Sequence, residues 1–215
     1  MESIIYPPNI YPILPKEINW SVTARILAYL VCIGIAFLCA FLLERYTAKR
    51  FGQGNRIINL LFPTAAAAVL ILVSGYTMIS LKGFILFLLL LYASVSDLAI
   101  REAEDYIPLM IILTALIGIG ISDIPVMLIA TVVITVPQLA VAVLKPGTYG
   151  GADIKIMAAC TFLLGLTKGM FALVTGLLLA VVVTIIVRKI KEQNVKEPFA
   201  LIPYLSVGCF LAYLI

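Results

Sequence analysis

Long apolar runs dominate this chain, and they restrict it to a fold built inside a lipid bilayer. Each run needs about 20 residues to cross the hydrocarbon core as a helix, because backbone polar groups find no water there and must pair within the segment. We therefore predict an all-α, polytopic membrane helix bundle of about eight transmembrane helices. The eight candidate runs are 21–43, 57–80, 83–100, 107–121, 126–144, 153–166, 169–187 and 198–215.

The composition agrees with a membrane protein and removes several kinds of chemistry. Hydrophobic residues make up 63% of the chain and charged residues 12%, against about 25% charged in soluble domains. The chain has no histidine, which excludes Ser-His-Asp triads and His-ligated zinc. Its four cysteines lie inside apolar runs without a C-x-x-C pair, so we expect helix packing from them, no metal site and no cofactor. Carboxylates are the main acid–base groups that remain.

Lysine and arginine are distributed unevenly between the loops on the two sides of these runs. One side carries only Lys16, Arg25, Lys82 and Lys168. Because cytoplasmic loops collect lysine and arginine, we predict a multi-pass cell-membrane protein with both termini outside. The net charge of +4 follows from this bias, and without a basic stripe interleaved with aromatics we expect no nucleic-acid partner. The other, cytoplasmic side carries Arg45, Lys49, Arg50, Arg56, Arg101, Lys145, Lys155, Arg188, Lys189, Lys191 and Lys196.

Two aspartates lie at the edges of apolar runs, where a carboxylate is costly. Asp97 comes near the end of one run, and Asp153 closes Gly150-Gly151-Ala152-Asp153 before another. A functional role is the default expectation for such groups. Each also has a simpler explanation, since Asp97 lies at helical i, i+4 spacing from Arg101 and Asp153 fits an ordinary helix N-terminus.

Taken together, the two aspartates fit acid–base chemistry. Asp97 is expected at a helix C-terminus, which favours its protonated form, and Asp153 at a helix N-terminus, which favours its ionised form. This is the division that one acid and one base require. If the two carboxyl groups approach closely, one can activate water while the other protonates or polarises a scissile carbonyl. The topology places both aspartates at the cytoplasmic face.

The residues around the two aspartates resemble the type IV prepilin peptidases and the archaeal preflagellin peptidases. The similar motifs are Ser96-Asp97 with Arg101-Glu102 and Tyr106-Ile107-Pro108, the Gly-Gly-Ala-Asp-Ile-Lys run at 150–155, and Pro198-Phe199 with Pro203-Tyr204-Leu205. Members of this family are membrane aspartyl proteases whose second aspartate lies in a G-x-G-D motif. Ala152 replaces the last glycine of that motif, which requires a negative φ at this residue. The resemblance covers residues 83–215.

The resemblance implies that Asp97 and Asp153 are the catalytic pair of an aspartyl endopeptidase. It implies cleavage of class III signal peptides, a basic leader followed by an apolar helix, in prepilin- or preflagellin-like precursors at the cytoplasmic membrane face. We expect residues 81–215 to form a six-helix peptidase core, and residues 1–80 a lead-in with a two-helix extension. This extension lacks the paired cysteines that accompany methyltransferase activity in many members, so we do not predict that activity.

Several residues near the aspartates are candidates for substrate binding. The acids Glu102, Glu104 and Asp105 carry the charge opposite to that of a basic leader. Gly150 and Gly151 either let the backbone approach an extended substrate or simply form the turn. Pro137 and Pro203 are expected inside helices, where a proline kink would open a water-accessible cleft.

Two other functions stay open. One is an intramembrane protease of the presenilin or signal-peptide-peptidase type, although the chain has no Tyr-Asp at the first site and no Pro-Ala-Leu before the last helix. The other is a proton-coupled transporter in which the same aspartates relay protons. The carboxylates lie near one face, whereas transporter sites usually lie near the midplane.

Overall fold

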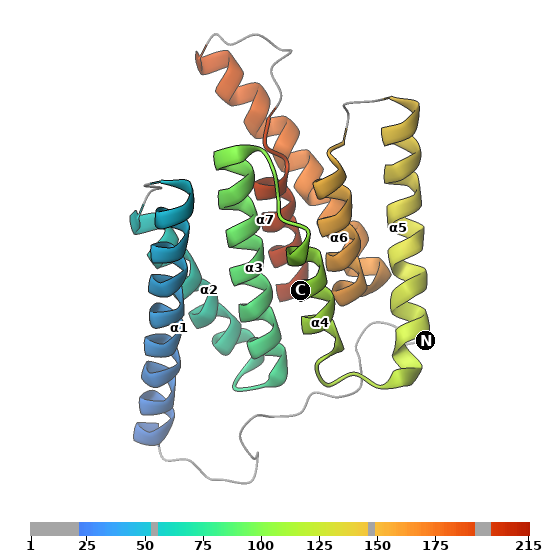
Figure 1. Cartoon of the computed structure of the whole chain (residues 1–215). Coiled ribbons are helices and arrows are strands. Elements are labelled where there is room, and N and C mark those ends of the chain that lie inside the picture. Colours follow the sequence, from blue (N-terminus) through green and yellow to red (C-terminus); the bar gives the residue numbers. More distant parts are fainter. Residues whose placement is uncertain (1–21, 53–55, 146–148, 192–198) are drawn as a thin grey trace.

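The computed structural model describes residues 22–52, 56–145, 149–191 and 199–215. The predicted lead-in, residues 1–20, lies outside these ranges. The described part is helical and contains no strand, which confirms the all-α class (Figure 1). Its elements are α1 (Val22–Phe51), α2 (Arg56–Ser74), α3 (Met78–Ile100), α4 (Tyr106–Leu116), the 3-10 helix η2 (Ile121–Asp123), α5 (Ile124–Leu144), α6 (Gly151–Lys191) and α7 (Ile202–Leu214).

Five of the described helical segments are long and apolar enough to cross a membrane. These are α1, α2, α3, the segment formed by η2 with α5, and α6. The helices α4 and α7 have only 11 and 13 residues, which correspond to about 17 and 20 Å at a rise of 1.5 Å per residue. The multi-pass membrane protein is confirmed, whereas the predicted count of eight spans is not.

The path of α6 explains why the eight predicted runs correspond to seven α-helices among the described residues. Gly165 has non-helical torsion angles inside α6, with φ 77° and ψ −179°, and the chain turns back there (Figure 1). The runs 153–166 and 169–187 therefore correspond to the two arms of α6. The run 107–121 is also shortened, because α4 stops at Leu116 and Gly118 follows with a positive φ of 67°.

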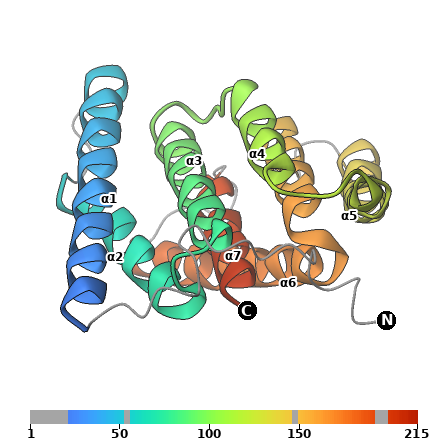
Figure 2. The ribbon, with the colours of Figure 1, turned by 90° about the horizontal axis from the view of Figure 1, so that it is seen from below.

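The buried core is formed by α3, α4, α6 and α7. Its fully buried side chains include Leu90, Ile107, Met157 and Cys209, one from each of these helices. The helix α7 lies between α3 and α6 and contacts both (Figure 2). The helices α1 and α2 pack at one edge and α5 at the other, so the helices that carry the two aspartates are central.

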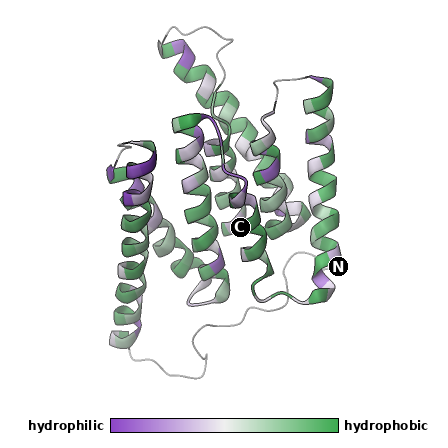
Figure 3. Ribbon diagram, viewed as in Figure 1, coloured by the Kyte–Doolittle hydropathy of each residue, from purple (hydrophilic) through white to green (hydrophobic). Residues whose placement is uncertain are grey.

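One end of the bundle collects most of the basic residues, and we call it the basic end. The ends of α1, α3, α5 and α6 lie there, together with the starts of α2 and α6 (Figure 1). Hydrophilic residues gather at this end in Figure 3. The arrangement agrees with the uneven charge distribution in the sequence. Basic residues of these segments are Arg45, Lys49, Arg50, Arg56, Arg101, Lys145, Lys155, Arg188 and Lys189.

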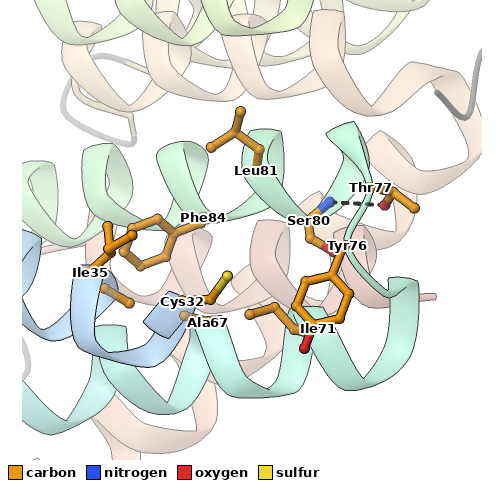
Figure 4. A pocket seen from close by; sticks show the side chains of 10 residues that line it. Cys32, Ile35, Ala67, Ile71, Tyr76, Thr77, Ser80, Leu81 and Phe84 are labelled. Carbon is orange, nitrogen blue, oxygen red and sulfur yellow. Dashed lines mark hydrogen bonds between the residues drawn. The ribbon is translucent and has the colours of Figure 1, made fainter. Parts of the chain in front are cut away.

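An apolar cavity of about 320 Å³ lies between α1, α2 and α3 (Figure 4). Cys32 of α1, Ile71 of α2 and Phe84 of α3 contribute to its walls, together with Tyr76 and Thr77 from the turn between α2 and α3. That turn lies at the end of the bundle opposite to the basic end. None of the residues that line the cavity is charged.

Candidate active site

Asp97 lies in the last turn of α3 and is only 7% exposed. The backbone around it is fixed by two contacts. Arg101 ends the helix in the left-handed conformation with φ 58°, and its amide donates to the Asp97 carbonyl at 3.0 Å. The Ser96 hydroxyl donates to the Glu102 carbonyl at 2.7 Å. The loop that follows α3 is thus joined directly to the segment that carries Asp97.

The Asp97 carboxylate faces the start of α7. Its Oδ2 accepts a hydrogen bond from the backbone amide of Ile202 at 3.1 Å. Ile202 is the first residue of α7, and the first amides of a helix have no partner within that helix. Pro203 follows in the first turn, a position that proline favours. The predicted kink at Pro203 is therefore wrong, because this proline begins α7 instead of interrupting it.

The contact with α7 changes the electrostatic surroundings expected for Asp97. From the sequence, we expected Asp97 to lie only at the C-terminus of its own helix. In the structure it also faces the N-terminus of α7. Arg101 interacts electrostatically with Asp97, but it follows the helix in a left-handed conformation, so it is not the helical i, i+4 neighbour that the sequence predicted. Both aspartates consequently accept a hydrogen bond from a backbone amide at the start of a helix. The expected contrast, with Asp97 at a helix C-terminus and Asp153 at a helix N-terminus, is therefore not found in this simple form.

Asp153 is the third residue of α6 and caps its first turn. Its Oδ2 accepts a hydrogen bond from the backbone amide of Gly150 at 3.0 Å, as the acid of a capping box does. A Cβ atom on Gly150 would lie 2.9 Å from this oxygen, whereas a Cβ on Gly151 would meet nothing within 4 Å. Ala152 lies inside the helix without a positive φ, so its methyl group is accommodated.

The fold brings the two aspartates near each other. Their carboxyl groups lie near enough to interact electrostatically, although α4 and α5 separate them in the chain. Tyr149 adjoins Asp153, and burial together with this carboxylate raises the pKa of the Tyr149 hydroxyl. A tyrosine hydroxyl is protonated at neutral pH even without such a shift, so this one can donate a hydrogen bond. Two neighbouring carboxyl groups of this kind can divide the roles of acid and base.

The three acids predicted to bind a basic leader occupy the loop between α3 and α4, in different surroundings. The Glu104 side chain is 17% exposed and pairs with Arg50 of α1. The Asp105 side chain is 83% exposed and pairs with Lys155 of α6 at 2.6 Å. Glu102 is exposed, and its carboxylate has no partner among the described residues. Glu102 and Asp105 are accordingly the more accessible acids of the three.

Three residues in this region were not identified as site residues from the sequence. Ile202 contacts Asp97, and both Tyr92 and Arg50 contact Glu104. Ile202 contributes a backbone amide, which no side-chain pattern reveals. Tyr92 donates to Glu104 at 3.3 Å, and the only signal in the sequence was a phenol inside an apolar run, which usually finds a partner when buried. Arg50 was counted only as one of the basic residues of the cytoplasmic loops.

Residues 84–185 match the type IV leader peptidase family. The matched region contains α4 and α5, most of α3 and of α6, and both aspartates. No curated protein and no solved structure gives a match. The match confirms the family resemblance inferred from the motifs, and it supports a membrane-embedded protease.

Proposed function

We propose that this chain is a membrane aspartyl endopeptidase that cleaves class III signal peptides of prepilin- or preflagellin-like precursors at the cytoplasmic membrane face. The observation that carries the proposal is that the carboxyl groups of Asp97 and Asp153 lie near enough to interact electrostatically, within the region similar to the leader peptidases. Two carboxyl groups at such a site cannot easily both ionise, so they share a proton and form an acid–base pair.

In the proposed reaction, the ionised carboxylate removes a proton from a water molecule, whose oxygen attacks the scissile carbonyl carbon. The other carboxyl group gives its proton to the carbonyl oxygen, and a tetrahedral intermediate forms. When the intermediate collapses, the carbon–nitrogen bond breaks and the amine leaves with a proton from the pair. The amides of Gly150 and Ile202 orient the two carboxylates throughout.

We further propose that the basic leader of the substrate lies against the loop between α3 and α4. The exposure of Glu102 and Asp105 supports this position, because opposite charges guide association and fix register. A leader that binds Asp105 must exchange with Lys155, and both members of that pair are largely exposed to solvent. Glu104 is less accessible, since it is already paired with Arg50.

The catalytic roles can be tested with purified protein and a precursor that has a basic leader and an apolar helix. We expect wild-type protein to cleave at the junction of leader and helix, and Asp97→Asn and Asp153→Asn to lose cleavage without a change in thermal midpoint. Persistent cleavage by either variant would contradict the pair.

The leader site can be tested with a precursor whose leader has been neutralised. This change should raise KM for the wild type, and it should raise KM by a smaller factor for a variant with both Glu102→Gln and Asp105→Asn.

Mass spectrometry of the products separates the remaining functions. A cut inside the apolar helix would favour an intramembrane protease of the presenilin type. Absence of any cut, combined with proton flux into vesicles that depends on Asp97, would favour a transporter.

A further inference from the structure

Glu104, seven residues after Asp97, is held by side chains from three helices. A guanidinium nitrogen of Arg50 pairs with its Oε1, and the hydroxyl of Tyr92 donates to the same oxygen at 3.3 Å. The hydroxyl of Tyr106 also interacts with Glu104. We call this group the Glu104 cluster. It comprises Tyr46, Arg50 and Phe51 of α1, Tyr92 of α3, Glu104 of the loop and Tyr106 of α4.

The guanidinium of Arg50 is oriented by its own helix before it reaches the loop. Its Nη1 donates to the Tyr46 hydroxyl at 2.9 Å, and it lies over the Phe51 ring, 5.7 Å from the centroid. The rings of Tyr46 and Phe51 lie 5.9 and 6.0 Å from that of Tyr92. The planar guanidinium can make these contacts at once, which the ammonium group of a lysine cannot.

The loop that Arg50 anchors is short and directly joined to Asp97. Its near end is fixed by the hydrogen bond from Ser96 to the Glu102 carbonyl. Its far end is fixed where the Ile107 amide donates to the Glu104 carbonyl at 3.1 Å. A displacement of Glu104 therefore moves the carbonyl that holds Ser96, the residue next to Asp97.

We infer that Arg50 is a positioning residue of the active site, which acts through Glu104 to fix the loop after Asp97 and hence the direction of the Asp97 carboxylate. Arg50 lies outside the region that matches the leader peptidases, so this assignment gives the N-terminal helix α1 a part in the reaction. The inference rests on the proposed function. It also assigns Glu104 to loop positioning instead of leader binding.

The adjacent acid provides an internal comparison. Asp105 pairs with Lys155 across the same loop, but their side chains are 83% and 58% exposed, and exposed ion pairs contribute little. Lys155 competes with the leader for Asp105, so the control variant is taken from α1. Arg45→Gln is this control, because Arg45 lies on the same helix as Arg50 and its guanidinium lies over the Phe41 ring, 5.1 Å from the centroid.

The kinetic test compares these variants on the precursor substrate. Arg50→Gln should lower kcat by about tenfold or more with little change in KM, because small misplacements of reacting groups cost up to about a hundredfold in rate. Arg50→Lys should recover only part of this loss. The double variant Arg50→Glu with Glu104→Arg should be more active than either single variant, and Arg45→Gln should retain the wild-type kcat.

A second readout does not require cleavage. A spin label at Glu102→Cys, with Cys32 and Cys39 replaced by alanine, reports the mobility of the loop. We expect higher mobility with Arg50→Gln and no change with Arg45→Gln.

The two proposals can fail separately. If the wild type cleaves no precursor, the proposed function is wrong, but the spin label still measures whether Arg50 restrains the loop. Unchanged mobility in Arg50→Gln overturns the inference, as does a kcat loss that matches a lowered thermal midpoint and shows no rescue in the double variant.

Discussion

At the residue scale, both aspartates are oriented by backbone amides. Asp97 accepts from Ile202 and Asp153 from Gly150, each through Oδ2. Backbone donors do not titrate and have little conformational freedom once their helices are packed. Such preorganisation suits a site in which the direction of a carboxyl group decides whether it reaches water or substrate.

Gly150→Ala tests this orientation. The new Cβ would lie 2.9 Å from Asp153 Oδ2, so the carboxylate or the turn must shift, and we expect cleavage to slow by about tenfold or more. The matched variant Gly151→Ala places its Cβ in open space and should keep or slightly raise the thermal midpoint, since alanine is favoured over glycine in helices by roughly 0.5–1 kcal/mol. A wild-type cleavage rate in Gly150→Ala would show that the contact is dispensable.

At the scale of elements, the position of α7 decides whether the site is complete. Its contact with the second arm of α6 is close, because a Cβ on Gly176 would lie 2.9 Å from Leu205 Cα. Small residues at such contacts let membrane helices approach closely. A hydrogen bond of 3.0 Å from Ser94 to Ser206 joins α7 to α3. Both contacts hold Ile202 at the level of Asp97.

Gly165→Ala tests the turn that divides α6. The torsion angles of Gly165 belong to a region that is essentially restricted to glycine, and a side chain there costs about 1–3 kcal/mol. We expect a lower thermal midpoint in detergent for this variant.

Gly34→Ala is the control for this measurement, because Gly34 lies within α1 with no positive φ and with open space at its Cβ. Its midpoint should stay the same or rise. Equal stability of Gly165→Ala and the wild type would mean that the turn does not depend on this backbone conformation.

At the scale of the whole molecule, the basic end and the aspartates lie together. Asp97 is near the end of α3 and Asp153 near the start of α6, both of which lie at that end. If lysine and arginine orient the bundle as they do in other membrane proteins, the site opens to the cytoplasm.

Cysteine labelling in intact cells checks this orientation. In a background with Cys32 and Cys39 replaced by alanine, Lys145→Cys at the basic end should react with a membrane-impermeant maleimide only after the cells are opened. Ser122→Cys, which is exposed beside α5 at the opposite end, should react in intact cells. The reverse pattern would show that the bundle has the opposite orientation.

The sequence predicted most of the helices because hydropathy is a local property. The runs 83–100 and 126–144 correspond closely to α3 and α5, whereas the run 57–80 extends past the end of α2 at Ser74 and through the turn into α3. It also singled out Asp97 and Asp153, because charge at the edge of an apolar run is conspicuous. The turn at Gly165 was located within a few residues, but the short α4 was overestimated, since nothing in an apolar run tells where a helix stops short of the headgroups.

The sequence by itself determined the membrane class, the uneven charge, the pair of aspartates and the family resemblance, since each depends on residue type and spacing along the chain. Only the tertiary structure decided that Ile202 donates to Asp97, that Asp97 and Asp153 interact, and that Arg50 reaches Glu104. These contacts depend on how far one helix is shifted along another. Residue type does not indicate which backbone amide will donate to a carboxylate. It also does not indicate whether an arginine at a helix end faces the lipid headgroups or pairs with a loop.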